Sequence, residues 1–269
     1  MLNLNGTVLS NLPADLERAS RGLFYSDALF ETMRVFGVRL PFLERHLERL
    51  FAGMDALGYA QPAAWSPDFF RIEILKISPP NARVRLTIWR TAGGRFLPEN
   101  NAPHFLIAAE PLAEPTFSWP ETGLKLGIAQ TVVLPCDAFS NFKTLNAARY
   151  VAAAREARAG GFDDVLIPNQ HGRICETTIA NVFMFDKKRL VTPALSEGCV
   201  AGTMRAAVLE LAVKTGLAVA EQPVTFAALA RAEEIFLTNA VRGIVPVGEF
   251  QGRKLPSTRA RDLFEKLTI

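Results

Sequence analysis

Two residues of the sequence have side chains suited to covalent chemistry on an amino compound. Lys143 lies between Phe142 and Leu145, and such apolar neighbours disfavour the ammonium form and leave a nucleophilic amine. A lysine of this kind is typical of Schiff-base chemistry with a carbonyl compound. Glu176 lies on the return strand of a predicted hairpin, which would place it beside the strand that precedes Lys143.

A lysine that forms a Schiff base with one such carbonyl compound, pyridoxal phosphate, needs an anionic partner for the pyridine nitrogen of that cofactor. A protonated pyridine ring is the stronger sink for carbanion electrons, and a carboxylate such as Glu176 would hold that proton. Taken one at a time, Lys143 is more often a surface lysine at a helix start, and Glu176 a solvated carboxylate beside a turn. The spacing of the two residues alone does not decide between these interpretations.

The elements that must position these residues are predicted from apolar periodicity and turn residues. We expect a helix from Leu145 to Ala159, stopped by Gly160 and Gly161, and then a hairpin of residues 164–168 with a return strand from Ile174. Other strands are expected at residues 1–8, 28–36, 83–90, 105–109, 124–129, 131–134, 190–193, 233–239 and 244–250, and other helices at residues 43–57, 66–76, 205–214 and 258–267.

Proline recurs every four or five residues between residues 111 and 120, which blocks both a regular helix and a central strand. We therefore expect a small N-terminal α/β domain of residues 1–110, a linker of residues 111–120 and a larger C-terminal domain of residues 121–269. The fold class predicted is mixed α/β, with an α+β small domain and a barrel-like α/β large domain.

Several arginines are candidate anion-binding groups. Arg34 lies on a strand with one charge on each face, and Arg95 lies in the loop after Gly93 and Gly94. Arg90 is in phase with the apolar side chains of its strand, so it is either a strand-end residue that reaches solvent or a desolvated anion binder. Arg49 lies on the same side of its helix as His46 and, by itself, is typical of a solvated flank residue.

Composition excludes several other classes of protein. The chain has 269 residues, a net charge of +3 and interspersed acidic and basic residues, so no basic stripe indicates nucleic acid binding. Three cysteines without CxxC spacing and three scattered histidines predict neither disulfides nor a metal site. Without a signal-like N-terminus or a long apolar run, we expect a soluble cytoplasmic protein that binds no membrane.

The sequence resembles the class IV, or fold type IV, pyridoxal-phosphate enzymes, which include D-amino acid and branched-chain aminotransferases and aminodeoxychorismate lyase. The resemblance covers nearly the whole chain. It is carried by six motifs in the family's order: Arg21–Thr32, His46–Leu50, Lys143–Asn146, Glu176–Phe183, Gly202–Arg205 and Leu237–Ala240 followed by Pro246–Val247.

The resemblance implies a role for each motif residue. Lys143 would bond the cofactor, Glu176 would bind its ring nitrogen and Arg49 its phosphate. Further cofactor contacts are expected from the backbone amides of Thr203 and Met204 and from Thr238 and Asn239, although the last two are also typical turn formers. The expected substrate-binding residues are Tyr25, Arg34, Arg90, Arg95, Thr178 and Ala240.

The predicted activity is amino-group transfer between an amino acid and a 2-keto acid, in a homodimer with shared active sites. Three arginines in the small domain favour dianionic substrates such as glutamate and 2-oxoglutarate. D-amino acids are favoured because Lys143-Thr-Leu-Asn146 is similar to the Lys-x-Leu-Asn of the D-amino acid group. The alternatives are aminodeoxychorismate lyase, which shares that motif, a branched-chain L-amino acid aminotransferase, and a binding protein that has lost its chemistry.

Overall fold

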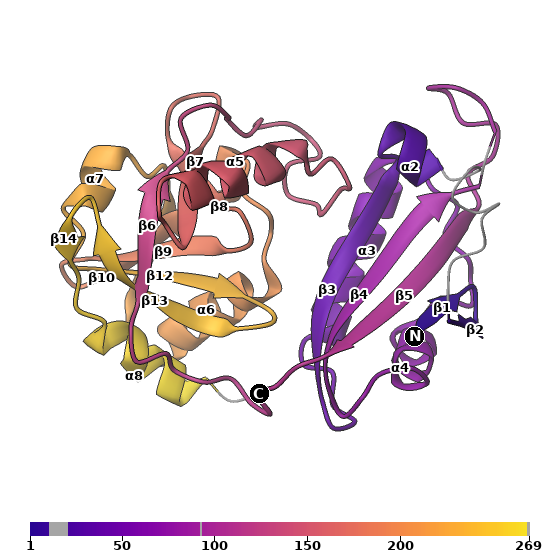
Figure 1. Ribbon diagram of the computed structural model, residues 1–269, viewed down its shortest axis with the longest axis horizontal. Helices are drawn as coiled ribbons and strands as arrows, with labels where there is room; N and C mark the ends of the chain where they lie inside the picture. Colours follow the sequence, from indigo (N-terminus) through magenta and orange to yellow (C-terminus); the bar gives the residue numbers. More distant parts are fainter. Residues whose placement is uncertain (11–20, 92, 268–269) are drawn as a thin grey trace. The chain divides into compact units, whose positions relative to one another are not determined.

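Alternating apolar side chains in the first part of the chain form an antiparallel five-stranded sheet (Figure 1). The computed structural model describes residues 1–10, 21–91 and 93–267. The order of the strands is β2-β1-β5-β4-β3. They are β1 (Leu2–Leu4), β2 (Thr7–Leu9), β3 (Ala28–Phe36), β4 (Asn81–Arg90) and β5 (Pro103–Pro111).

Two helices cover one face of this sheet, after the short helix α2 (Arg21–Tyr25). In α3 (Leu43–Ala56) the apolar residues recur at helical spacing and pack with β3 and β4 in one core. The helix α4 (Pro67–Leu75) begins as predicted, because the Ser66 hydroxyl accepts the Phe69 N–H at 3.1 Å. The buried face of β3 carries Leu29 and Met33, so the opposite face carries the side chains of the intervening residues.

The segment that contains Lys143 is extended and pairs with the edge strand β3. The Phe30 N–H donates to the Lys143 carbonyl at 2.8 Å, and the Leu145 N–H donates to the Ala28 carbonyl at 3.0 Å. The helix predicted from Leu145 therefore begins later, as α5 (Ala148–Ala159). Pairing with a distant strand satisfies the backbone groups that a helix would otherwise have used.

The second part of the chain forms a mixed nine-stranded sheet. Eight of its strands follow the order β11-β10-β9-β12-β13-β6-β7-β8, and β14 pairs with β13. The strands are β6 (Leu124–Ile128), β7 (Asp164–Pro168), β8 (Ile174–Thr177), β9 (Asn181–Asp186), β10 (Arg189–Pro193), β11 (Ala218–Gln222), β12 (Glu234–Asn239), β13 (Gly243–Phe250) and β14 (Arg253–Lys254). The helices are α5, η1 (Leu195–Glu197), α6 (Thr203–Lys214), α7 (Phe226–Ala230) and α8 (Thr258–Lys266).

One predicted strand of this part is wrong. Residues 131–134 form no strand, and Leu134 makes only a single bridge to Asn169. The Thr131 backbone instead donates to the carboxylate of Glu156 on α5, so a side chain takes the place of a strand partner. The predicted hairpin of β7 and β8 is confirmed, with Glu176 opposite Ile167.

Contacts divide the chain into two units. The first unit is Met1–Thr116 with Phe142–Asn146, and the second is Phe117–Asn141 with Ala147–Ile269. The division at Thr116 falls within the predicted linker, whereas the inclusion of Lys143 in the first unit was not predicted. No helix within the described ranges is long and apolar enough to cross a membrane.

Candidate functional site

Lys143 lies against an aromatic ring in the first unit. Its Nζ is 4.7 Å from the centre of the Phe30 ring, and the side chain is half-buried. Phe142 packs against the apolar core beneath β3, which agrees with the apolar surroundings expected from the sequence. The ring offers an attractive but weakly polar surface to a cation, so Lys143 is held beside β3 rather than extended into water.

Arg49 belongs to a buried cluster with Glu31 and His46. Its Nε donates to Glu31 at 2.8 Å, one of its Nη atoms donates to the other oxygen of the same carboxylate, and the Nδ1 of His46 lies 2.6 Å from that carboxylate. Burial raises the pKa of Glu31, but Arg49 and His46 outweigh it and bring the pKa to about 2. The ionised Glu31 thus fixes the plane of the Arg49 guanidinium.

Electrostatic coupling links this cluster to the nucleophilic lysine. Burial lowers the pKa of His46, Glu31 raises it, and the positive charges of Arg49 and Lys143 lower it further. A charge on Lys143 is therefore felt at the buried imidazole. The first unit brings together three of the residues that the sequence analysis considered: Lys143, Arg49 and His46.

Arg90 is buried, but its anion comes from the protein. Its Nη1 lies 2.6 and 2.8 Å from the two carboxylate oxygens of Asp27, and its guanidinium lies 4.1 Å from the centre of the Tyr59 ring. Arg21 donates to the same carboxylate at 2.8 Å. Because Arg90 already binds a carboxylate, its contacts favour a structural role over the substrate role predicted for it.

The other small-domain candidates have different environments. Arg34 is buried on β3 and donates to the carbonyls of Glu114 and Thr116. Arg95 is exposed, and the Arg21 guanidinium holds its carbonyl at 2.6 Å. Tyr25 is partly exposed, and its ring centre is 5.7 Å from that of Phe96. Arg95 and Tyr25 are therefore accessible on the first unit, whereas Arg34 is enclosed.

Arg85 is a candidate that the sequence analysis missed. Its guanidinium carbon lies 3.8 Å from the centre of the Phe30 ring, the ring that Lys143 also contacts. Burial and the positive charge of Arg83 lower the pKa of Arg85, and among the described residues no hydrogen bond or ion pair involves its guanidinium. The alternation of residues 83–90 predicts the face of the strand on which Arg85 lies, but its contact with the Phe30 ring depends on the register between β4 and β3.

In the second unit, three donors surround the buried carboxylate of Glu176. The Tyr150 hydroxyl donates to Oε1 at 2.7 Å, and Oε2 accepts the Val200 N–H at 3.0 Å and the Asn181 side-chain amide at 3.3 Å. Glu176 is only 3% exposed, and hydrogen bonds to a carboxylate favour its ionised form. The three donors therefore hold the carboxylate in one orientation, as a partner of a ring nitrogen requires.

The remaining predicted residues of this unit have mixed environments. The Thr178 hydroxyl donates to Asp164 at 2.7 Å, which fixes the β8–β9 turn. The Asn239 side chain accepts the N–H groups of Val241 and Arg242, so it caps a turn, and Ala240 lies in that turn. Thr203 and Met204 form the first turn of α6, where Gly202 provides no side-chain cap.

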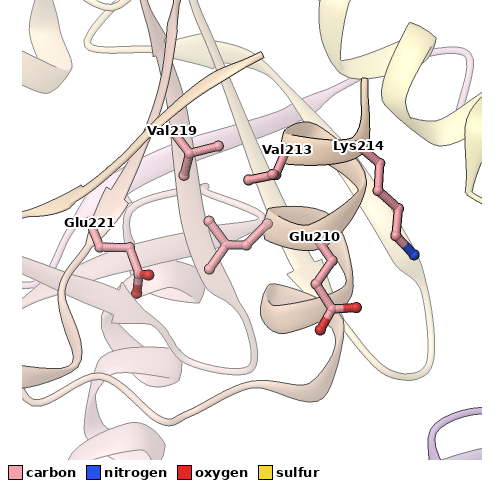
Figure 2. Close-up of a pocket in the computed structure, with 6 residues that line it drawn as sticks. Glu210, Val213, Lys214, Val219 and Glu221 are labelled. Carbon is pink, nitrogen blue, oxygen red and sulfur yellow. The ribbon is translucent and has the colours of Figure 1, made fainter. Parts of the chain in front are cut away.

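An open groove lies elsewhere on the second unit, between α6 and β11. Its volume is about 500 Å³, and none of the predicted site residues lines it. Figure 2 shows Val213 and Val219 facing one another across the groove, with Glu210 and Lys214 pointing outward. The groove is thus separate from the candidate residues at the start of α6.

Comparison with known proteins identifies the family. A family model described as amino-transferase class IV matches residues 28–250. The chain belongs to the class IV aminotransferases. Enzymes of this family use pyridoxal 5'-phosphate, so the predicted family, enzyme class and cofactor are confirmed.

Relatives with different activities resemble the chain over most of its length. A putative branched-chain-amino-acid aminotransferase of Methanocaldococcus jannaschii is 28% identical over 269 residues, with 98% of this chain and 92% of the relative covered. The solved 4-amino-4-deoxychorismate lyase of Pseudomonas aeruginosa is 28% identical, with a TM-score of 0.85 and coverage of 99% and 98%. An aminotransferase of Brucella abortus bound to PLP is 25% identical, with a TM-score of 0.81 and coverage of 98% and 97%. The predicted fold class is confirmed.

The residues present fit the family's cofactor. Thr238 is 1% exposed, and its Oγ1 is a buried hydroxyl for which the described residues provide no hydrogen-bond partner. Such an atom costs about 1–3 kcal/mol unless an acceptor reaches it. A phosphate oxygen is such an acceptor, and the N-terminal end of α6, where the helix dipole favours an anion, begins at Thr203.

Proposed function

We propose that the chain transfers an amino group between an amino acid and a 2-keto acid, with glutamate and 2-oxoglutarate as its acidic pair. The observation that carries this proposal is the contact of Arg85 and Lys143 with the same Phe30 ring. A half-buried guanidinium without an ion pair among the described residues favours an anionic ligand. A dicarboxylate would have its amine at Lys143 and a carboxylate at Arg85.

Each functional residue then has a defined task. When bound, pyridoxal phosphate supplies an electron-poor ring that takes up the electron pair left by removal of the substrate's α-proton. Lys143 binds the cofactor and, once released, its Nζ takes and returns that proton. Glu176 holds a proton at the ring nitrogen, and Arg49, Thr238 and the first-turn amides of α6 bind the phosphate.

We propose D-amino acids as the preferred donors because Lys143-Thr-Leu-Asn146 resembles the Lys-x-Leu-Asn of D-amino acid aminotransferases. The Methanocaldococcus jannaschii relative is named for branched-chain amino acids, so L-leucine and L-isoleucine are the comparison substrates.

A lyase is the second candidate. The Pseudomonas aeruginosa lyase matches this chain at 28% identity over 99% of its length, and the lyases share the Lys-x-Leu-Asn motif. In that reaction, the same proton abstraction by Lys143 would be followed by loss of pyruvate and aromatisation of the substrate ring. No second keto acid would then be needed, which gives a simple experimental distinction.

We also propose that the active protein is a homodimer. Apolar side chains are exposed on α2 and on the loop that follows β4, with Phe96 at 91% and Leu97 at 83%. Leu23, Phe24 and Tyr25 extend this apolar surface. Because Arg21 binds three carbonyls of the loop, the surface is held in shape for a second copy of the chain.

The experiment is a half-reaction screen with the cofactor-loaded protein and no keto acid. We expect D-glutamate or D-alanine to bleach the visible band of the cofactor faster than their L-enantiomers, L-leucine or L-isoleucine. A preference for L-leucine or L-isoleucine would assign branched-chain transamination instead. Release of p-aminobenzoate from aminodeoxychorismate without an amino-group acceptor would assign the lyase.

A further inference from the structure

The Tyr150 hydroxyl donates a hydrogen bond to the buried carboxylate of Glu176. Tyr150 lies in the first turn of α5, and its hydroxyl oxygen is 2.7 Å from Oε1 of Glu176 on β8. The Tyr150 ring packs against the apolar cluster that includes Val165 and Cys175. The ring is therefore held by packing, and its hydroxyl is held at the carboxylate.

The direction of this hydrogen bond is determined by charge. Burial and the negative charge of Glu176 raise the pKa of Tyr150 well above its usual range. Tyr150 therefore stays protonated, and its hydroxyl is the donor of this hydrogen bond. Oε2 of Glu176 receives its donors from other elements, the Val200 N–H before α6 and the Asn181 amide on β9. Rotation of the Glu176 carboxylate would break hydrogen bonds to both of its oxygens.

We propose that Tyr150 is a positioning residue that orients Glu176 toward the ring nitrogen of bound pyridoxal phosphate and keeps the shared proton on that nitrogen. This inference rests on the proposed role of Glu176. A donor to Oε1 stabilises the carboxylate relative to the carboxylic acid, so the proton stays on the ring. Orientation adds to the effect, because a charge-assisted hydrogen bond weakens when its angle is lost.

The test compares two cofactors in the Tyr150→Phe variant. Apo-protein is titrated with pyridoxal phosphate and with its 1-deaza analogue, in which a C–H group replaces the ring nitrogen. We expect the unaltered protein to bind pyridoxal phosphate more tightly than the analogue. Tyr150→Phe should reduce this preference roughly three- to tenfold, as expected for one lost hydrogen bond, and change the affinity for the analogue less than about twofold.

Two further variants separate positioning from packing. Glu176→Gln should abolish the preference, and addition of Tyr150→Phe to it should change nothing more, because the two residues act through one contact. Tyr59→Phe removes a hydroxyl that donates to the Asp27 carbonyl at 2.9 Å in the first unit, so it should leave the preference unchanged. Thermal unfolding of each apo-protein shows whether the variant is folded.

The measurements distinguish a failure of the role inferred for Tyr150 from a failure of the role proposed for Glu176. Equal weakening of both cofactors by Tyr150→Phe would mean a packing role, and an unchanged preference would mean that Tyr150 does not act on Glu176. Either result overturns this inference while a preference lost in Glu176→Gln still supports the proposed function. If the unaltered protein shows no preference, or if Glu176→Gln retains it, the role of Glu176 and this inference fail together.

Discussion

The Phe30 N–H donates a hydrogen bond to the Lys143 carbonyl at 2.8 Å, so the lysine is fixed to the edge of β3 by its own backbone. Its side chain then returns over the Phe30 ring, with Nζ 4.7 Å from the ring centre. Backbone and side chain therefore contact the same residue. This arrangement restricts the position of the amine before any cofactor binds.

Borohydride reduction of the cofactor-loaded protein should attach the cofactor to Lys143. Lys143→Ala should give a colourless protein without transaminase activity, because the residue provides the amine for both bonding and proton transfer. Peptide mass spectrometry after reduction identifies the labelled residue. Lys125→Ala, at a partly exposed lysine of the second unit, is the matched control and should remain yellow. Label on another lysine would contradict the assignment.

Arg85→Met should raise the Michaelis constant for glutamate and 2-oxoglutarate by roughly ten- to a hundredfold, since one charge-assisted hydrogen bond is lost. D-alanine, without a side-chain carboxylate, should be affected much less. The control is Arg83→Met, because Arg83 binds the exposed Glu110 at 3.0 Å. Steady-state kinetics with glutamate and with D-alanine as amino-group donors measures this difference. An equal rise of the Michaelis constant for D-alanine would assign Arg85 to a different role.

Regular periodicity made the elements of the first unit predictable. The helix of residues 43–57 and the strand of residues 28–36 were expected from local apolar spacing and are present as α3 and β3. The extended conformation of Lys143 was not predictable in this way, because it depends on hydrogen bonds to a strand far away in the sequence. Local propensity was overridden by a tertiary contact.

The sequence predicted several residues of the candidate site, but it did not predict which side chains they contact. Alternation correctly put Arg90 on the buried face, yet it gave no indication that Asp27 would supply the anion. Arg85 was missed because its place in the alternating strand is ordinary, and because the Phe30 ring that both it and Lys143 contact belongs to another strand. Pairing register, which no local pattern encodes, separates a structural arginine from a candidate ligand.

Arg90→Ile should destabilise the protein and leave the Michaelis constant for glutamate nearly unchanged. Breaking the buried pair leaves Asp27 with Arg21 as its remaining charged partner within the described part of the chain, so we expect a loss of about 3 kcal/mol, the low end for a broken buried ion pair. Urea unfolding measures the loss. A stable variant with a strongly raised Michaelis constant would return Arg90 to the substrate site.

The buried His46 should make stability depend on pH below neutrality. Burial holds the pKa of His46 below its usual 6.5 in the folded protein, so between these two values the unfolded chain binds more protons than the folded one. The free energy of unfolding therefore falls as the pH is lowered through this window, by at most about 1.4 kcal/mol per pH unit for one group. His104 contributes with the same sign, because burial lowers its pKa too.

Urea unfolding of the unaltered protein and of His46→Gln at pH 7.5, 6.5 and 5.5 checks this expectation. His46→Gln should be less stable at pH 7.5, because it loses the contact with Glu31 at 2.6 Å, but its stability should decline less steeply on acidification. His171→Gln, at an exposed histidine, is the control and should keep the original slope. The free energy of unfolding is expected to fall a second time between pH 4.5 and about 2, because the pKa of Glu31 is about 2 in the folded protein and 4.5 in the unfolded chain. In this range the unfolded chain again binds more protons than the folded one. An unchanged slope in His46→Gln would show that the buried imidazole is not the group that titrates.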